Sequence, residues 1–202
     1  AGVTNPVEIN FLEAGAILPD IKFKAVIVNA ADKLDMLFSL ICKIGDRSAL
    51  IFCNHREAVE RISDLLWETG IAHGVFHGGM EQEDRERALL KFRNGSYRML
   101  ITTDLASRGL DIPEIEFIVH YQLPHNREAF LHRNGRTARM QAKGTSYLIF
   151  TEDEKPKWLH EEPEIETLSD HDPVPPPSSW STLYLAAGKK DKINKVDIVG
   201  LL

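Results

Sequence analysis

The sequence predicts an α/β fold: a doubly wound parallel sheet with helices on both of its faces. Short continuous apolar runs, such as residues 49–53, are typical of strands that are buried on both sides. Between these runs, apolar residues such as Val59 and Ile62 recur at helical spacing. Gly70 and Gly95 follow two of the helical stretches, at positions where helices commonly end. Strands that alternate with amphipathic helices indicate the α/β class.

The elements can be predicted in order along the chain. The predicted strands are residues 23–28, 49–53, 74–77, 98–102, 116–121 and 145–150. The first helix is expected after Asp32, a candidate N-cap, and a short helical run is expected from near Asn126. In this fold class ligands gather at the carboxyl ends of the strands. The candidate site segments just after strands are residues 54–56, 77–79, 102–108 and 123–126.

Residues 132–139 hold three arginines at three-residue intervals around Gly135: Arg133, Arg136 and Arg139. A guanidinium stays charged at physiological pH and offers five donors in a rigid plane, which suits phosphate oxygens. Three such groups that converge on one spot would bind a phosphate. A solvated basic surface is the alternative interpretation of this cluster.

The segment 102–113 follows a predicted strand and combines hydroxyls, one arginine and two carboxylates, Asp104 and Asp111. Gly109 permits a close approach of the backbone to a ligand. These groups suit phosphate oxygens and sugar hydroxyls, although an ordinary loop with a capping Asp would have the same composition.

Four segments in order resemble motifs of the second RecA-like domain of DEAD-box RNA helicases. Residues 50–54 resemble motif IV, residues 77–85 resemble the segment with a Gln-x-x-Arg element, and residues 102–113 and 132–139 resemble motifs V and VI. The resemblance covers roughly residues 25–150. Four motifs in order, each near the end of a predicted strand, are specific, whereas one motif alone would be weak.

The resemblance implies how this chain contacts a nucleotide. Arg136 and Arg139 are expected to reach the γ-phosphate of ATP as catalytic residues, with Arg139 as the principal arginine finger. Asp111 is expected to accept hydrogen bonds from the ribose. The side chains expected to couple ATP to the interdomain surface are Arg108, His132 and Arg133.

The chain departs from the motif VI pattern at two positions. Asn134 stands where the family has an aliphatic residue, and Ala138 stands where it has a glycine. Ala138 disfavours a positive φ, which bears on where Arg139 points.

The resemblance also implies an RNA-binding surface. The residues that match positions holding the sugar-phosphate backbone are Gly78, Gln82, Arg85 and Thr103. Contacts of this kind carry affinity without sequence choice.

Neither a Gly-x-x-x-x-Gly-Lys-Ser/Thr phosphate loop nor an Asp-Glu-Ala-Asp element occurs in the sequence. We therefore expect an N-terminal RecA-like domain of the same polypeptide to hold ATP with Mg²⁺. This chain is expected to supply no metal ligand and, alone, to hydrolyse essentially no ATP. His73 and His77 without a third ligand make a poor zinc site.

The net charge of −6 does not exclude an RNA partner, because the acidity is local. Residues 152–172 contain nine acidic residues and two lysines, a net charge of −7, and the remainder carries +1. The overall charge is therefore a poor guide to the surface of the predicted domain.

We predict four parts: a lead-in at 1–22, the RecA-like domain at 23–160, an acidic and proline-rich linker at 161–180, and a tail at 181–202. In the tail, residues 182–186 predict a strand, 189–192 a basic turn and Asn194 a helix cap. The tail resembles the opening of the RRM-like RNA-binding domain of the bacterial DbpA-like subfamily, which implies a role on ribosomal RNA.

No apolar run is long enough to span a bilayer, and the first ten residues lack a signal-peptide pattern. Cys42 and Cys53 lie in apolar patterns, as small core residues do in a reducing compartment. We therefore predict a cytoplasmic protein.

The predicted function is the C-terminal lobe of an ATP-dependent RNA helicase. Two alternatives stay open: a lobe of a superfamily-two DNA translocase, and a non-catalytic RNA- or protein-binding module on the same fold.

Overall fold

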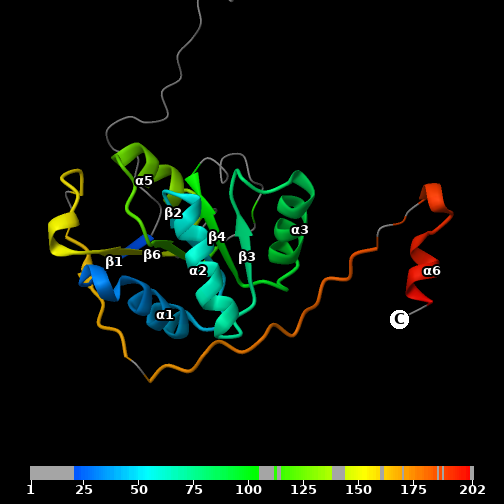
Figure 1. Cartoon of the computed structure of the whole chain (residues 1–202), viewed down its shortest axis with the longest axis horizontal. Coiled ribbons are helices and arrows are strands. Elements are labelled where there is room, and N and C mark those ends of the chain that lie inside the picture. The colour runs from blue at the N-terminus through cyan, green and yellow to red at the C-terminus, as the bar shows by residue number, and fades with distance from the viewer. Residues whose placement is uncertain are drawn as a thin grey trace, which may run out of the picture.

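The structure is a computed structural model, and it describes residues 21–104, 112, 115–137, 144–159, 162–169, 171–185, 187 and 189–200. These residues build a seven-stranded sheet in the order β3-β4-β2-β5-β6-β1-β7 (Figure 1). Every pairing between the described strands is parallel. The strands are β1 Ile21–Ile27, β2 Ala49–Cys53, β3 His73–Phe76, β4 Met99–Thr103, β5 Phe117–His120, β6 Gly144–Phe150 and β7 Glu164–Ile165.

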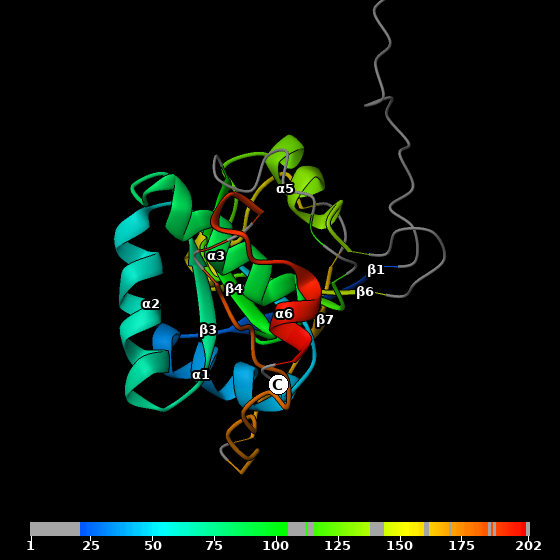
Figure 2. The same ribbon diagram turned by 90° about the vertical axis from the view of Figure 1, so that its right-hand side faces the viewer.

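Helices cover both faces of the sheet. Helices α1 (Lys33–Ile44) and α2 (Arg56–Glu68) pack in one apolar cluster that includes Ile51 of β2. Helix α3 (Gln82–Arg93) lies on the other face with Leu50 and Phe52, and Figure 2 shows α2 and α3 on opposite sides of β3. Helix α5 (Arg127–Asn134) packs Phe130 on that second face. Adjacent residues of β2 thus point to opposite faces, and the predicted doubly wound fold is confirmed.

The helix ends also agree with the sequence. Gly70 and Gly95 follow α2 and α3 with φ values of +74° and +76°, which glycine adopts without strain. Asn126 caps α5 by accepting a hydrogen bond from the backbone N–H of Ala129 at 2.8 Å. Asp32 precedes α1 as predicted, but its side chain makes no capping hydrogen bond.

Part of the segment predicted as a linker, 161–180, takes part in the sheet, because β7 extends it. Glu164 of β7 pairs with Lys24 of β1, so β7 is the outermost strand at this edge of the sheet. Glu166 accepts hydrogen bonds from the Nζ atoms of Lys24 and Lys43, both at 2.7 Å. The first part of the segment 161–180 therefore belongs to the sheet, and two lysines on different elements hold it there.

The strand predicted at 182–186 is wrong for residues 182–185, which are not in a strand and pair with none of the described strands; beyond them the chain runs on to α6 (Figure 1). Ser178 donates a hydrogen bond to the carbonyl oxygen of Gly95 at 2.6 Å, and the hydroxyls of Thr182 and Ser96 lie 2.7 Å apart. The guanidinium of Arg87 lies 4.7 Å from the ring centroid of Tyr184. The tail is thus docked on α3 through side chains.

Beyond this docked segment the chain forms a 3₁₀ turn, η3 (Lys189–Asp191), and a short helix, α6 (Lys195–Val199). Asn194 caps α6 by accepting from the backbone N–H groups of Val196 and Asp197, as predicted. No helix in the described part of the chain is long and apolar enough to cross a membrane.

Candidate functional site

The strand order brings the predicted site segments to one edge of the sheet. Strands β3, β4, β2 and β5 are consecutive neighbours, so the residues after their carboxyl ends adjoin one another. In the register of β3 and β4, Phe76 lies beside Thr102, which places the turn after β3 next to Thr103. Loops far apart in sequence therefore meet at this carboxyl edge.

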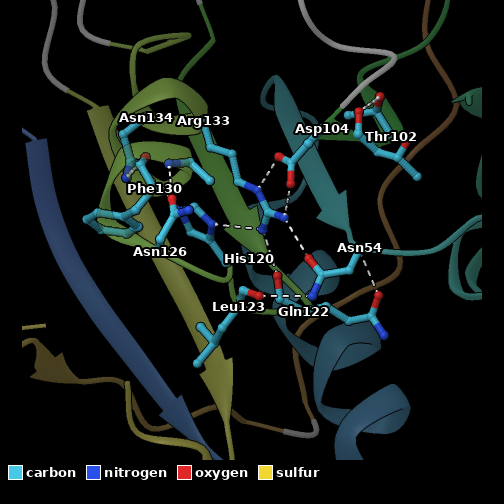
Figure 3. Close-up of polar contacts among 12 residues, drawn as sticks. Asn54, Thr102, Asp104, His120, Gln122, Leu123, Asn126, Phe130, Arg133 and Asn134 are labelled. Carbon is cyan, nitrogen blue, oxygen red and sulfur yellow. Dashed lines mark hydrogen bonds and ion pairs between the residues drawn. The ribbon is translucent and has the colours of Figure 1, made fainter. Parts of the chain in front are cut away.

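A buried arginine, Arg133, ties these loops together (Figure 3). Its Nε and Nη2 atoms donate to the two carboxylate oxygens of Asp104 at 2.6 and 2.7 Å, a bidentate ion pair. Nη2 also donates to Asn54 Oδ1 at 2.7 Å, and Nη1 donates to the carbonyl oxygen of Gln122 at 2.7 Å. The guanidinium lies 5.0 Å from the centroid of the Phe52 ring. One side chain of α5 thus joins β2, β4 and β5.

Asn54 and Gln122 reinforce the same junction. The backbone N–H of Asn54 donates to Gln122 Oε1 at 2.7 Å, and the Asn54 side chain donates to the carbonyl oxygen of Leu123 at 3.0 Å. These bonds link the ends of β2 and β5 directly (Figure 3). Hydrogen bonds that do not involve Arg133 therefore also hold these two strand ends together.

His120 lies below this junction and is fully buried. Burial, followed by the nearby charge of Arg133, holds the pKa of His120 well below its ordinary value. Its ring contacts Ser146 Oγ at 3.1 Å, Asn134 Oδ1 at 3.4 Å and Arg133 Nη1 at 3.4 Å. His120 is therefore neutral and structural, and the sequence analysis did not single it out.

The prediction that three arginines converge on one phosphate is wrong for Arg133, which is only 2% exposed. Phe130, Arg133 and Asn134 are the buried residues of α5, at the three- and four-residue spacing of a helix face that points inward. Arg133 therefore does not reach a nucleotide directly. Arg136 follows the helix end and is half-buried.

The other motif VI residues differ in their exposure to solvent. His132 is exposed, and its Nε2 lies 3.6 Å from Glu128 one turn earlier. Asn134 is fully buried and donates to the carbonyl oxygen of Phe130 at 2.9 Å, so this departure from the family pattern serves packing. Four predicted residues lie outside the described part: Arg108, Asp111, Ala138 and Arg139.

The four residues predicted to bind RNA lie on neighbouring elements, β4, the turn after β3 and the start of α3. Gly78 has no atom within 4 Å of the place where a Cβ would be, so its surroundings are open. Thr103 is half-buried at the end of β4. Gln82 donates to Glu86 at 2.7 Å, whereas the buried Nε atom of Arg85 has no hydrogen-bond partner in the described structure.

The described residues contain no group of three or more His, Cys, Asp or Glu side chains that could hold a metal ion. Cys42 and Cys53 are both free and buried. Burial raises the pKa of Cys53 to about 12, although the charges of Arg133 and Arg61 oppose that shift. The Cys53 thiol is thus protonated and inert.

Comparison with known proteins agrees with this architecture. The family model described as "Helicase conserved C-terminal domain" matches residues 32–141. ATP-dependent RNA helicase DbpA of Bacillus subtilis is 36% identical over 151 residues, which cover 75% of this chain and 32% of that protein. ATP-dependent RNA helicase eIF4A of Mycosarcoma maydis is 38% identical over 151 residues, which cover 74% of this chain and 37% of that protein. The chain therefore spans about a third of the length of these curated relatives.

Solved structures show the same fold. The C-terminal domain of the DEAD-box protein Dbp5 has a TM-score of 0.60 and 30% identity, with 66% of this chain and 78% of that chain covered. A DEAD-box protein from Methanococcus jannaschii has a TM-score of 0.62 and 31% identity, with 66% and 37% covered. The chain has a RecA-like fold and belongs to the family of helicase conserved C-terminal domains, with DEAD-box RNA helicases as its relatives.

Proposed function

We propose that this chain is the C-terminal lobe of an ATP-dependent RNA helicase, which binds the RNA backbone and completes an ATP site on an N-terminal RecA-like lobe. The observation that carries the proposal is that the described parts of the four motif segments meet at one carboxyl edge of the sheet, where Arg133 donates to Asn54 and Asp104. On one side of that edge lie Gly78, Gln82, Arg85 and Thr103; on the other, Arg136 follows α5.

RNA binding is supported by the state of Arg85 and Gly78. The Arg85 Nε has no partner within the described residues, and a buried polar atom without a partner is costly. An RNA phosphate would pair with the half-buried guanidinium of Arg85, because guanidinium and phosphate form strong charge-assisted hydrogen bonds. The open space at Gly78 allows a sugar-phosphate backbone to approach the protein backbone closely.

ATP hydrolysis in the full-length protein would use Arg136 and Arg139 as cations for the charge of the transferred phosphoryl group. Asp111 would hold the ribose, and Arg108 and His132 would face the interdomain surface. Mg²⁺ would neutralise the phosphate charge, and its ligands would come from the N-terminal lobe, because this sequence has no Asp-Glu-Ala-Asp element. Arg133 would contribute to ATP hydrolysis indirectly, by holding the residues after β2, β4 and β5 in place.

Two finer parts of the proposal concern the biological setting. The similarity of the tail to the start of an RRM-like domain supports ribosomal RNA as the substrate. The two free cysteines suit the reducing cytoplasm, where we place the protein.

The experiment that tests the function is ATP turnover of the full-length protein with RNA or with DNA added. We expect stimulation by RNA only, and Arg139→Ala should lower the stimulated rate about 10³-fold or more while RNA affinity stays near that of the wild type. Equal stimulation by DNA would favour the translocase alternative. Unchanged turnover in Arg139→Ala would contradict the arginine-finger role.

A further inference from the structure

The turn after β3 is closed by a side chain whose role the motif resemblance leaves unassigned. His77 is 7% exposed, and its Nδ1 atom accepts a hydrogen bond from the backbone N–H of Gly79 at 3.1 Å. The carbonyl oxygen of His77 also accepts from the N–H of Met80 at 3.2 Å. Residues 77–80 thus form a β-turn with a second, side-chain bond to the residue two positions on, as in the turns that Asn and Asp side chains make.

The two glycines of this turn have opposite surroundings. A Cβ added to Gly79 would lie 3.3 Å from His77 Nδ1 and 3.7 Å from Arg56 Nη1, so Gly79, although exposed, lies against the imidazole. A Cβ added to Gly78 would meet nothing within 4 Å. The imidazole therefore holds one side of the turn and leaves the other side open to a ligand.

The hydrogen bond also determines which ring nitrogen carries the proton. Because Nδ1 accepts from Gly79, the proton of the neutral ring is on Nε2. Nε2 points toward Glu60 of α2, at 4.0 Å from Oε1, which is too long for a direct hydrogen bond. The contact that shapes the turn is consequently the one through Nδ1.

We propose that His77 is a positioning residue for RNA: its imidazole holds the 77–80 turn in the shape that presents Gly78 and the start of α3 to the RNA backbone. The inference rests on the proposed RNA-binding role of Gly78, Gln82 and Arg85. Without the Nδ1 bond, the Gly79 amide loses its partner and the turn samples other conformations. Ordering the turn then reduces the free energy of RNA binding.

Two substitutions separate the Nδ1 contact from the bulk of the side chain. His77→Asn places an amide oxygen where Nδ1 lies and restores the bond to the residue two positions on. His77→Gln places its polar group near Nε2 and leaves Gly79 unpaired. Gly79→Ala disturbs the same contact from the other side, because its Cβ crowds the imidazole.

The test measures the Kd of the full-length protein for a fluorescent oligouridine in the presence of a non-hydrolysable ATP analogue. We expect His77→Gln and Gly79→Ala to raise Kd about fivefold to tenfold, and His77→Asn to stay within about twofold of the wild type. In ATPase assays, the RNA concentration for half-stimulation should rise in the same two variants while maximal turnover holds.

Arg85→Ala, measured alongside, distinguishes failure of this inference from failure of the proposed function. If Arg85→Ala weakens RNA binding but His77→Gln and Gly79→Ala do not, the positioning role of His77 is wrong. If Arg85→Ala also leaves the Kd unchanged, the proposed RNA surface is wrong and the inference falls with it. Equal losses in His77→Asn and His77→Gln would overturn the Nδ1 mechanism.

Discussion

Arg133 and Arg85 stand at the same edge of the sheet and differ in what their guanidinium groups contact. All three nitrogen atoms of Arg133 donate to groups just after β2, β4 and β5, and the residue is 2% exposed. Arg85 is half-buried, and its Nε has no partner among the described residues. The comparison teaches that a motif arginine can serve the fold or a ligand, and that the helix face on which it lies decides between them.

The largest expected effect is on the stability that Arg133 supplies. Arg133→Met should lower the free energy of unfolding by about 2 kcal/mol, because Asn54 and the carbonyl oxygen of Gln122 lose a buried donor and the ion pair with Asp104 is broken. Urea denaturation measures the loss. The matched control is Arg127→Met, an exposed arginine of the same helix, which should change stability by less than about 0.5 kcal/mol. Equal effects of the two variants would contradict the buried role.

A smaller effect, on RNA affinity instead of stability, is expected at Arg85. Arg85→Ala should weaken oligouridine binding about tenfold, since one charge-assisted contact is lost, and should leave unfolding nearly unchanged. Arg87→Ala is the control on the same helix, because Arg87 contacts Glu83 and the Tyr184 ring. If Arg87→Ala weakens binding as much as Arg85→Ala, the effect is a general loss of positive charge.

The smallest effect, on stability, is expected at the edge of the sheet opposite β3, where hydrogen bonds from Lys24 and Lys43 to Glu166 hold β7. Burial alone would raise the pKa of Glu166, but hydrogen bonds from Lys24 and Lys43 bring it below the ordinary value of 4.5. A lowered folded-state pKa means stability that is present above 4.5 and is lost as the pH falls through the folded value. Glu166→Gln should therefore cost about 1 kcal/mol at neutral pH.

The pH dependence of unfolding provides the check on Glu166. The difference between wild type and Glu166→Gln should shrink as the pH falls below 4.5, because the wild-type carboxyl then becomes protonated as well. A difference that stays constant down to acid pH would show that the lysine contacts are not its cause.

The sheet could be predicted from the sequence because its strands are buried on both faces. The five residues of β2 are all buried, and a continuous apolar run such as Ala49–Cys53 is the direct signature of that environment. β7 was missed because a two-residue edge strand with charged neighbours has no apolar run. Residues 182–185 have the composition of a strand but pair with no strand in the part of the chain that the structure describes, and the predicted strand there is wrong.

For the candidate site, the sequence predicts which segments form it. The sequence does not predict the direction in which each side chain points. The three-residue spacing of the arginines treated Arg133 and Arg136 alike, as two of three cations around one phosphate. The spacing from Phe130 to Arg133 and Asn134 was the available signal that Arg133 lies on the inward face. Asp104 as its partner could not be predicted, because their meeting depends on the order of strands in the sheet.

The most direct test of the account is the RNA-stimulated ATP turnover of full-length Arg136→Ala, measured together with its unfolding temperature. We predict a fall in turnover of about 10³-fold, with an unfolding temperature that falls less than that of Arg133→Met, because Arg136 follows the end of α5 and is half-buried, whereas Arg133 is buried. Wild-type turnover in Arg136→Ala would contradict the claim that this lobe completes an ATP site on its partner.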